Sequence, residues 1–161
     1  MPAGKGPAPE ILHLLDVPAA QPLLARWFVE AWRPWYGPEG EGDAEADLAS
    51  CAARDRLPLC LVAIDGDGKP LGTASLKAES LGSELGYGPW LAAFLVDEPQ
   101  RGRGIGRTLI EAVAAEARRL GHTALYTSTE LPPERLWPRG WQAVGASTSL
   151  RGHITVYRLM L

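Results

Sequence analysis

The sequence predicts a domain of the α/β (α+β) class, in which a sheet is flanked by helices. Three observations lead to this prediction. The chain has 161 residues, which suits a single domain, and 46% of them are hydrophobic, which is enough for a packed core. Short apolar runs of strand length also alternate with segments of helical periodicity. We therefore expect one domain over residues 1–161, with a flexible end at residues 1–9, which are rich in Pro, Gly and Ala.

The first third of the chain is expected to be mainly helical. After a short strand over residues 10–15, the segment 18–32 predicts a helix, because its apolar residues recur three and four positions apart. Residues 33–42 contain several prolines and glycines and are expected to form a loop. Asp43 is expected to cap a second helix that extends to about residue 54.

Strands dominate the middle of the chain. The apolar run 59–64 and the segment 70–77 flank Asp65-Gly66-Asp67-Gly68, a sequence typical of a hairpin turn. Residues 90–96 are apolar at nearly every position, which predicts a central strand buried on both faces. Further strands are expected over residues 123–127, 142–150 and 153–161.

The best-defined helix is expected between residues 103 and 120. One face carries an apolar stripe formed by Ile105, Leu109, Val113, Ala117 and Leu120. Gly121 follows as a C-terminal cap, and Arg118 and Arg119 lie in the last turn, where the helix dipole favours cations.

Composition excludes several classes of protein. The longest apolar stretches are far too short to span a bilayer. No apolar segment follows Lys5, so we expect no signal peptide. Cys51 and Cys60 lack the spacing of a redox or zinc motif, and the three histidines are isolated. We expect a cytoplasmic protein that binds no metal.

A glycine-rich turn between the central strand and the long helix carries the chemistry. Gly102, Gly104 and Gly106 lack a Cβ, so a bulky group can approach the backbone closely. The first amides of a helix have no partner within it and carry partial positive charge, so such a turn can hold a phosphate. Charge-assisted contacts could come from Arg101, Arg103 and Arg107.

Other phosphate motifs fit this turn less well. A P-loop ends in Gly-Lys-Ser/Thr, and this turn does not. The dinucleotide fingerprint needs G-x-G-x-x-G, whereas these glycines give G-x-G-x-G, and Tyr126-Thr127-Ser128 supplies no acid for a ribose. A tight turn without a ligand is the remaining alternative, and the arginines and the strand–helix context favour phosphate binding over it.

The run Arg101-Gly102-Arg103-Gly104-Ile105-Gly106 resembles the Q/R-x-x-G-x-G/A signature of the GNAT superfamily of acyl-CoA-dependent N-acyltransferases. The surroundings are similar too. An apolar strand ends in Leu95-Val96-Asp97-Glu98-Pro99, and Gly140-Trp141 resembles the Gly-aromatic pair near the family's C-terminus. The resemblance is sharpest over residues 90–142.

This resemblance implies a mixed, mostly antiparallel sheet whose two central strands splay apart, with acetyl-CoA in the V between them. By analogy, the backbone of Phe94, Leu95 and Val96 would pair with the pantetheine arm. A backbone N–H there, which we assign to Leu95, would stabilise the oxyanion. An amine would attack the thioester directly in a ternary complex. The other cofactor contacts would come from Arg101, Gly102, Arg103, Gly104, Ile105, Gly106 and Arg107.

The proton donor that many family members share is missing. They carry a tyrosine before the Gly-aromatic pair, where an ungapped match gives Leu136 and a shift of one residue gives Trp137. Tyr126 is a candidate substitute, although a strand tyrosine more often fills the core. Glu79 and Glu84 are candidates for the general base, and a solvated loop acid is the alternative for each.

Aromatic and acidic residues gather near the expected acceptor site. In the superfamily the first helix–loop–helix region often walls that site, and here it contains Trp32, Trp35 and Tyr36. Aromatic faces attract cations, and the acids between Glu39 and Asp47 could draw in an amine. We expect a cationic acceptor, such as a small amine or a peptide amine. The structural alternative is a buried aromatic face with acids that suit a helix N-terminus.

A catalytically weak acyl-CoA-binding sensor or partner protein is the alternative function, because the tyrosine is missing. Nucleic acid binding is disfavoured, because the net charge is −3 and lysine-rich tails are lacking. No membrane partner is expected. Since family members are often dimers, a homodimer is possible by analogy.

Overall fold

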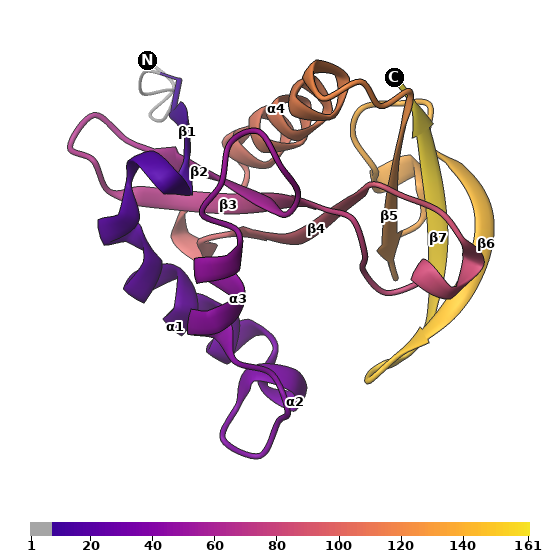
Figure 1. Cartoon of the computed structure of the whole chain (residues 1–161), viewed down its shortest axis with the longest axis horizontal. Coiled ribbons are helices and arrows are strands. Elements are labelled where there is room, and N and C mark those ends of the chain that lie inside the picture. Colours follow the sequence, from indigo (N-terminus) through magenta and orange to yellow (C-terminus); the bar gives the residue numbers. More distant parts are fainter. Residues whose placement is uncertain (1–7) are drawn as a thin grey trace.

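The computed structural model describes residues 8–161 and contains a seven-stranded sheet with helices on both faces (Figure 1). The strand order is β1-β2-β3-β4-β5-β7-β6, and the ladders are antiparallel except between β4 and β5. This is the mixed, mostly antiparallel sheet that the resemblance implied. The expected flexible end falls largely on residues 1–7, which lie outside the described residues. Every helix within residues 8–161 is too short or too polar to cross a membrane.

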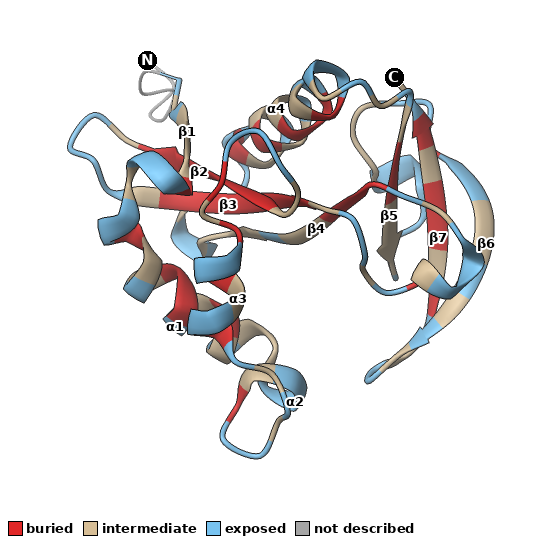
Figure 2. Cartoon of the chain, in the orientation of Figure 1, coloured by how far each residue is buried: buried red, intermediate tan, exposed pale blue. Residues whose placement is uncertain are grey.

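The first arm of the sheet consists of four antiparallel strands. They are β1 (Glu10–His13), β2 (Leu59–Ile64), β3 (Pro70–Lys77) and β4 (Trp90–Val96). One face is covered by α1 (Gln21–Ala31) and α3 (Ala44–Ser50), with α2 (Arg33–Tyr36) between them in the chain. The other face is covered by α4 (Ile105–Arg119). A buried cluster lies under each face, so β2 is buried along its whole length (Figure 2).

The second arm consists of β5 (Ala124–Thr129), β7 (Gly152–Met160) and β6 (Gln142–Ser149). The two arms meet where β4 and β5 run parallel, and the ladder between them is the single pair Trp90–Tyr126. Beyond this pair the two strands diverge (Figure 1). The predicted V between the central strands is therefore present.

Local sequence explains how the helices begin and end. The Asp43 carboxylate accepts a hydrogen bond from the Ala46 backbone N–H at 3.0 Å, so it caps α3 as predicted. The apolar stripe of α4 is buried against the sheet except for Leu120, which is partly buried. Gly121 follows α4 with φ 91°, the left-handed conformation that a C-terminal cap requires.

Four local predictions were wrong. The first strand ends at His13, before a 3₁₀ turn. The loop 33–42 begins with α2, because Pro34 suits a first helical turn and the Tyr36 N–H reaches the Trp32 carbonyl. The second helix ends at Ser50. β4 is buried only at its start, and Phe94 is 36% exposed, because the rest of the strand borders the open V.

Candidate active site

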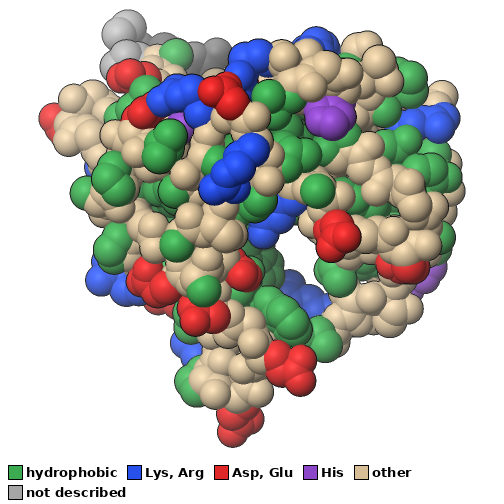
Figure 3. Space-filling model, in the orientation of Figure 1, with side chains coloured by type: hydrophobic (Ala, Val, Ile, Leu, Met, Phe, Trp, Pro, Cys, Tyr) green, Lys and Arg blue, Asp and Glu red, His purple; other side chains and the backbone are tan. Residues whose placement is uncertain are grey.

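A cleft opens where β4 and β5 diverge, with a volume of about 680 Å3. Its walls come from β4, the start of α4, the end of β5 and the segment 131–141, together with Trp32, Ser80 and Leu81. The space-filling view shows an opening between the two arms of the sheet (Figure 3). The cleft therefore lies in the V that the divergence of the strands creates.

β4 carries an irregularity inside this cleft. Its register with β3 shifts between the pairs Thr73–Leu95 and Ser75–Ala92. Ala93 lies in the shifted stretch and has a φ of 50°, a value that residues other than glycine rarely adopt. Such a bulge leaves a backbone group unpaired in the ladder and redirects it. Ala92, Ala93 and Phe94 all line the cleft, so the bulge forms part of its wall.

The glycine-rich turn opens α4 at the edge of the cleft. Gly102 and Gly104 have φ 81° and 83°, a conformation that favours glycine, and the space where their Cβ atoms would stand is open. Gly104 is the N-cap and provides no side chain to satisfy the first amides of α4. The turn thus presents N–H groups at the positive end of a 15-residue helix.

Gly106 is needed for a different reason. It lies within α4, and a Cβ there would come within 3.0 Å of the Phe94 ring. Both residues line the cleft, so this close approach of helix and strand shapes the floor below the turn.

The three arginines of the turn are exposed and take different positions. Arg101 donates to the Val96 carbonyl at 3.0 Å, and Arg103 donates to the Gln100 side chain at 3.3 Å. Arg107 points into the cleft wall, where its guanidinium lies 4.0 Å from the centroid of the Trp137 ring. Contacts of these side chains with a phosphate stay a prediction.

Sequence reasoning missed much of the wall formed by the segment 131–141. Arg135, Trp137 and Arg139 line the cleft there, and the Trp137 indole N–H donates to the Glu111 carboxylate at 3.2 Å. Trp141 donates to the Trp137 carbonyl at 3.0 Å. The signal that could have revealed this wall was two tryptophans four residues apart, with an arginine on either side of Pro138. The cleft lining contains three arginines against one glutamate, Glu134.

The other predicted backbone positions divide between the cleft and the core. The Phe94 side chain lines the cleft, whereas Leu95 packs toward the cluster under α1 and α3, and Val96 toward the cluster under α4. A backbone role for these residues does not depend on where their side chains point, and it stays a prediction.

Tyr126 takes a core position. It is 8% exposed and stacks on Tyr87, with ring centroids 4.7 Å apart and planes at 11°. Together with Trp90 it forms a small aromatic cluster, and it is not among the residues that line the cleft. This arrangement is the core packing that was the alternative for a strand tyrosine.

The two candidate bases differ in their surroundings. Glu79 is exposed and directly precedes Ser80 and Leu81, which line the cleft. Glu84 accepts a hydrogen bond from the Ser147 hydroxyl, and this bond holds the pKa of the Glu84 carboxyl below its ordinary value. A lowered pKa makes Glu84 the weaker proton acceptor.

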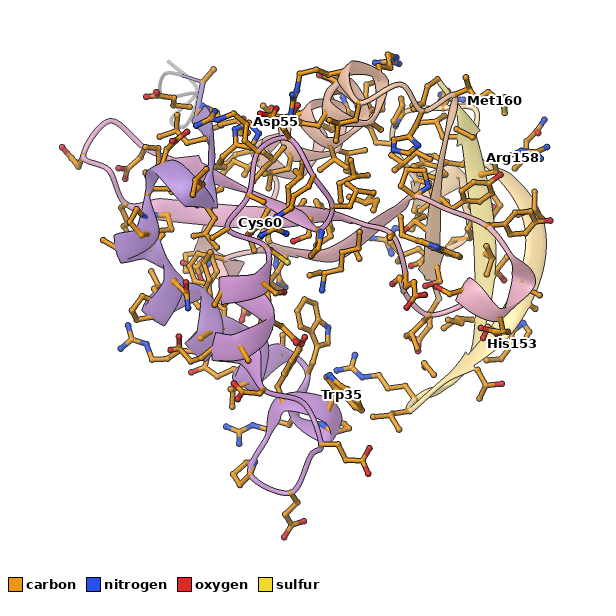
Figure 4. The ribbon with its side chains drawn as sticks, in the orientation of Figure 1. Trp35, Asp55, Cys60, His153, Arg158 and Met160 are labelled. Carbon is orange, nitrogen blue, oxygen red and sulfur yellow. The ribbon has the colours of Figure 1, made fainter. Side chains whose placement is uncertain are left out.

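The three aromatic residues of the expected acceptor region lie in different surroundings. Trp32 lines the cleft. Trp35 is 42% exposed, on the short helix α2 (Figure 4). Tyr36 lines a separate cavity of about 520 Å3 formed by α1 and the residues around Asp43, and it donates to Asp47 at 2.6 Å. Burial, and then the Asp47 carboxylate, raise the pKa of Tyr36.

Comparisons with known proteins agree with this geometry. The acetyltransferase (GNAT) family matches residues 24–137, which is more than half of the chain. No curated protein sequence matches the chain significantly.

Solved structures share the fold along nearly the whole chain. An aminoglycoside 6'-acetyltransferase type Ii is 18% identical, with a TM-score of 0.72 over 94% of this chain and 96% of that one. A GCN5-related N-acetyltransferase from Kribbella flavida is 22% identical, with a TM-score of 0.72 over 96% and 98%. An aminoglycoside 6'-N-acetyltransferase complexed with coenzyme A is 13% identical, with a TM-score of 0.69 over 94% and 96%. At these identities the likeness shows a common fold.

Proposed function

The chain belongs to the acetyltransferase (GNAT) family, and we propose that it transfers the acetyl group of acetyl-CoA to a cationic primary amine. One observation carries the proposal. The turn at the start of α4 has two glycines in the left-handed conformation and amides that no side chain caps. It lies beside β4, which pairs with β5 only at Trp90 and Tyr126. An anion at the turn and an extended chain along β4 both find partners there.

The cofactor would be held mainly by main chain. The amides of residues 101–106 would bind the pyrophosphate, and Arg101, Arg103 and Arg107 would add charge. The backbone of Phe94, Leu95 and Val96 would pair with the pantetheine arm. The excess of arginine in the cleft lining supports a ligand with several negative charges.

The reaction follows from this placement. The amine nitrogen attacks the thioester carbon, and an N–H near the bulge of β4, which we assign to Leu95, donates to the developing oxyanion. Before the attack the ammonium form of the amine loses one proton, which gives the nitrogen its lone pair. After the attack the C–S bond breaks, the thiolate leaves and takes up a proton from water, and the nitrogen gives up a second proton. Because a thiol has a pKa of about 8.5, the thiolate can leave without a strong acid. Glu79 would accept the first of these protons through water. Tyr126 has no part in this proposal, because it packs in the core and does not line the cleft.

A cationic acceptor is supported by two features. Trp32 offers an aromatic face inside the cleft. Acidic side chains gather over the arm that carries α1, α2 and α3 (Figure 3), and they would raise the local concentration of a cation. The aminoglycoside acetyltransferases of the same fold are consistent with a small amine. Trp35 and Tyr36 do not line this cleft, so of the three predicted aromatic residues Trp32 is the one proposed to contact the acceptor.

The cofactor site is tested with two matched variants. Gly104 and Gly86 have φ 83° and 84°, and both would carry a Cβ into open space. Gly104→Val and Gly86→Val therefore impose similar strain, of about 2 kcal/mol. In calorimetry we expect Gly104→Val to lose at least about tenfold in CoA affinity, while Gly86→Val binds like the wild type. Equal affinity in both variants contradicts the proposal.

Turnover separates the two candidate functions. Acetyl-CoA and a panel of cationic, neutral and anionic amines are incubated with the protein, and free thiol is measured. Release that is fastest with cationic amines supports the transferase. The position of the family's tyrosine holds Leu136, or Trp137 with a shift of one residue. The missing tyrosine favours the alternative, a catalytically weak acyl-CoA sensor, which would bind CoA tightly without releasing thiol. We expect the protein to act in the cytoplasm.

A further inference from the structure

A hydrogen bond joins the two arms of the sheet on the far side of the cleft from their base. Arg151 lies in the turn between β6 and β7, and its Nη2 donates to the Ala31 carbonyl at 2.7 Å. Ala31 is the last residue of α1. Figure 1 shows the tip of the β6–β7 hairpin reaching toward α2 and the end of α1. The two partners are 120 positions apart in the sequence.

Both partners suit this contact. The Ala31 carbonyl is one of the last four carbonyls of α1, which accept no hydrogen bond from an N–H of the same helix. The helix dipole also makes this end of α1 negative. A guanidinium is therefore a favourable partner. The turn also holds Arg151 in place, because the Ser149 hydroxyl accepts from the Arg151 N–H at 3.1 Å and donates to the Gly152 carbonyl at 3.2 Å.

With this contact the two arms of the sheet are joined at two places, so that they form a closed ring around the cleft. At the base the arms are joined by the Trp90–Tyr126 pair and by the Thr127 hydroxyl, which donates to the Leu91 carbonyl at 3.1 Å. At the rim they are joined by Arg151 and Ala31. Trp32, the next residue after Ala31, lines the cleft between these two points. The opening in Figure 3 has a continuous rim in that view, as a closed ring requires.

We propose that Arg151 selects the acceptor by its width. An unbranched amine passes through the closed ring and reaches the β4 bulge. An amine carried on a cluster of rings must first break the contact between Arg151 and Ala31. This inference rests on the proposed function, and it makes slim, linear amines the favoured class of acceptor.

The test compares a slim and a wide amine on the full chain. Spermidine is the linear amine, and tobramycin is the amine with three rings. Arg151→Ala removes the contact, and Leu150→Ala, at the neighbouring turn residue that is 68% exposed, is the matched control. Arg151→Lys keeps the charge and a donor. The measured quantity is kcat/KM for tobramycin divided by kcat/KM for spermidine.

We expect Arg151→Ala to raise this ratio about tenfold, Arg151→Lys to raise it less, and Leu150→Ala to leave it unchanged. A ratio that is the same in Arg151→Ala and the wild type overturns the proposal, as does an equal rise in Leu150→Ala.

The same comparison is made by calorimetry, with each amine titrated into CoA-loaded protein, so that it does not need turnover. If the affinity ratio rises in Arg151→Ala but no thiol is released with either amine, the proposed function fails and the selection by width stands. If neither amine binds, the selection by width fails, whatever the turnover with other amines.

Discussion

The guanidinium of Arg107 stacks on the ring of Trp137, 4.0 Å from its centroid. Arg107 belongs to the first turn of α4, whereas Trp137 belongs to the irregular segment before β6. Glu111, one turn further along α4, accepts a hydrogen bond from the same indole. The helix that presents the glycine turn therefore also holds the opposite wall of the cleft.

This stack leads to a prediction about coenzyme A. Arg107→Met removes the charge but keeps the length of the side chain, and we expect CoA affinity to fall about tenfold, because a charge-assisted contact contributes about 1.5–3 kcal/mol. Trp137→Phe keeps an aromatic face and should lose less than Trp137→Ala. Calorimetry at low and high salt is the measurement, and the loss in Arg107→Met should shrink with salt. If Arg107→Met binds CoA as tightly as the wild type, Arg107 supports the cleft wall at Trp137 but does not contribute to CoA binding.

A second prediction concerns the base. Glu79→Gln should lower kcat by about tenfold near neutral pH. This is less than the roughly 10²–10⁴-fold effect typical of a general base, because the proton is passed through water. Glu84→Gln should have a smaller effect, since Ser147 already lowers the pKa of Glu84. The pH dependence of kcat is measured for both variants. A larger loss of kcat in Glu84→Gln than in Glu79→Gln would make Glu84 the general base in place of Glu79.

The cap of α3 gives a prediction about stability. Asp43→Ala removes the acceptor for the Ala46 N–H and should cost about 1 kcal/mol. For a chain of this size the melting temperature should fall by roughly 2–4 °C. Asp43→Asn retains an oxygen in the same place and is the control. Thermal unfolding followed by circular dichroism decides the matter, and equal losses in both variants would show that the hydrogen bond is not the cause.

The buried thiol of Cys60 predicts a loss of stability in alkali. Cys60 is fully buried under α1 and α3 (Figure 4), and burial raises the pKa of its thiol from 9.0 to about 11. A group whose pKa is raised on folding stabilises the folded state below its unfolded pKa, and this contribution is lost as the pH rises through the folded pKa. The free energy of unfolding should therefore fall between pH 9.0 and about 11, by up to about 1.4 kcal/mol per pH unit.

Urea unfolding at a series of pH values measures this slope, and Cys60→Ala should be flatter between pH 9.0 and 10.0. Above pH 10.0, Tyr36 adds a loss of the same sign, because its pKa is also raised. The same slope in Cys60→Ala and the wild type would exclude the thiol as its source.

The elements that depend on neighbouring residues could be predicted from the order of amino acids alone. The stripe of α4 follows from side chains three and four positions apart, the cap at Asp43 from a bond between adjacent turns, and the glycine turn from backbone conformations that side chains disfavour. The hairpin between β2 and β3 has a similarly local cause, because its turn residues lie between two apolar runs.

Features that depend on residues far apart in the chain were set by the tertiary fold. It exposed the second half of β4, sent Trp32 into the cleft and Tyr36 to another cavity, and brought Arg107 onto Trp137. It also joined Arg151 to Ala31 across the rim. These contacts form when the two arms of the sheet diverge, and no periodicity in the sequence records the angle between the arms.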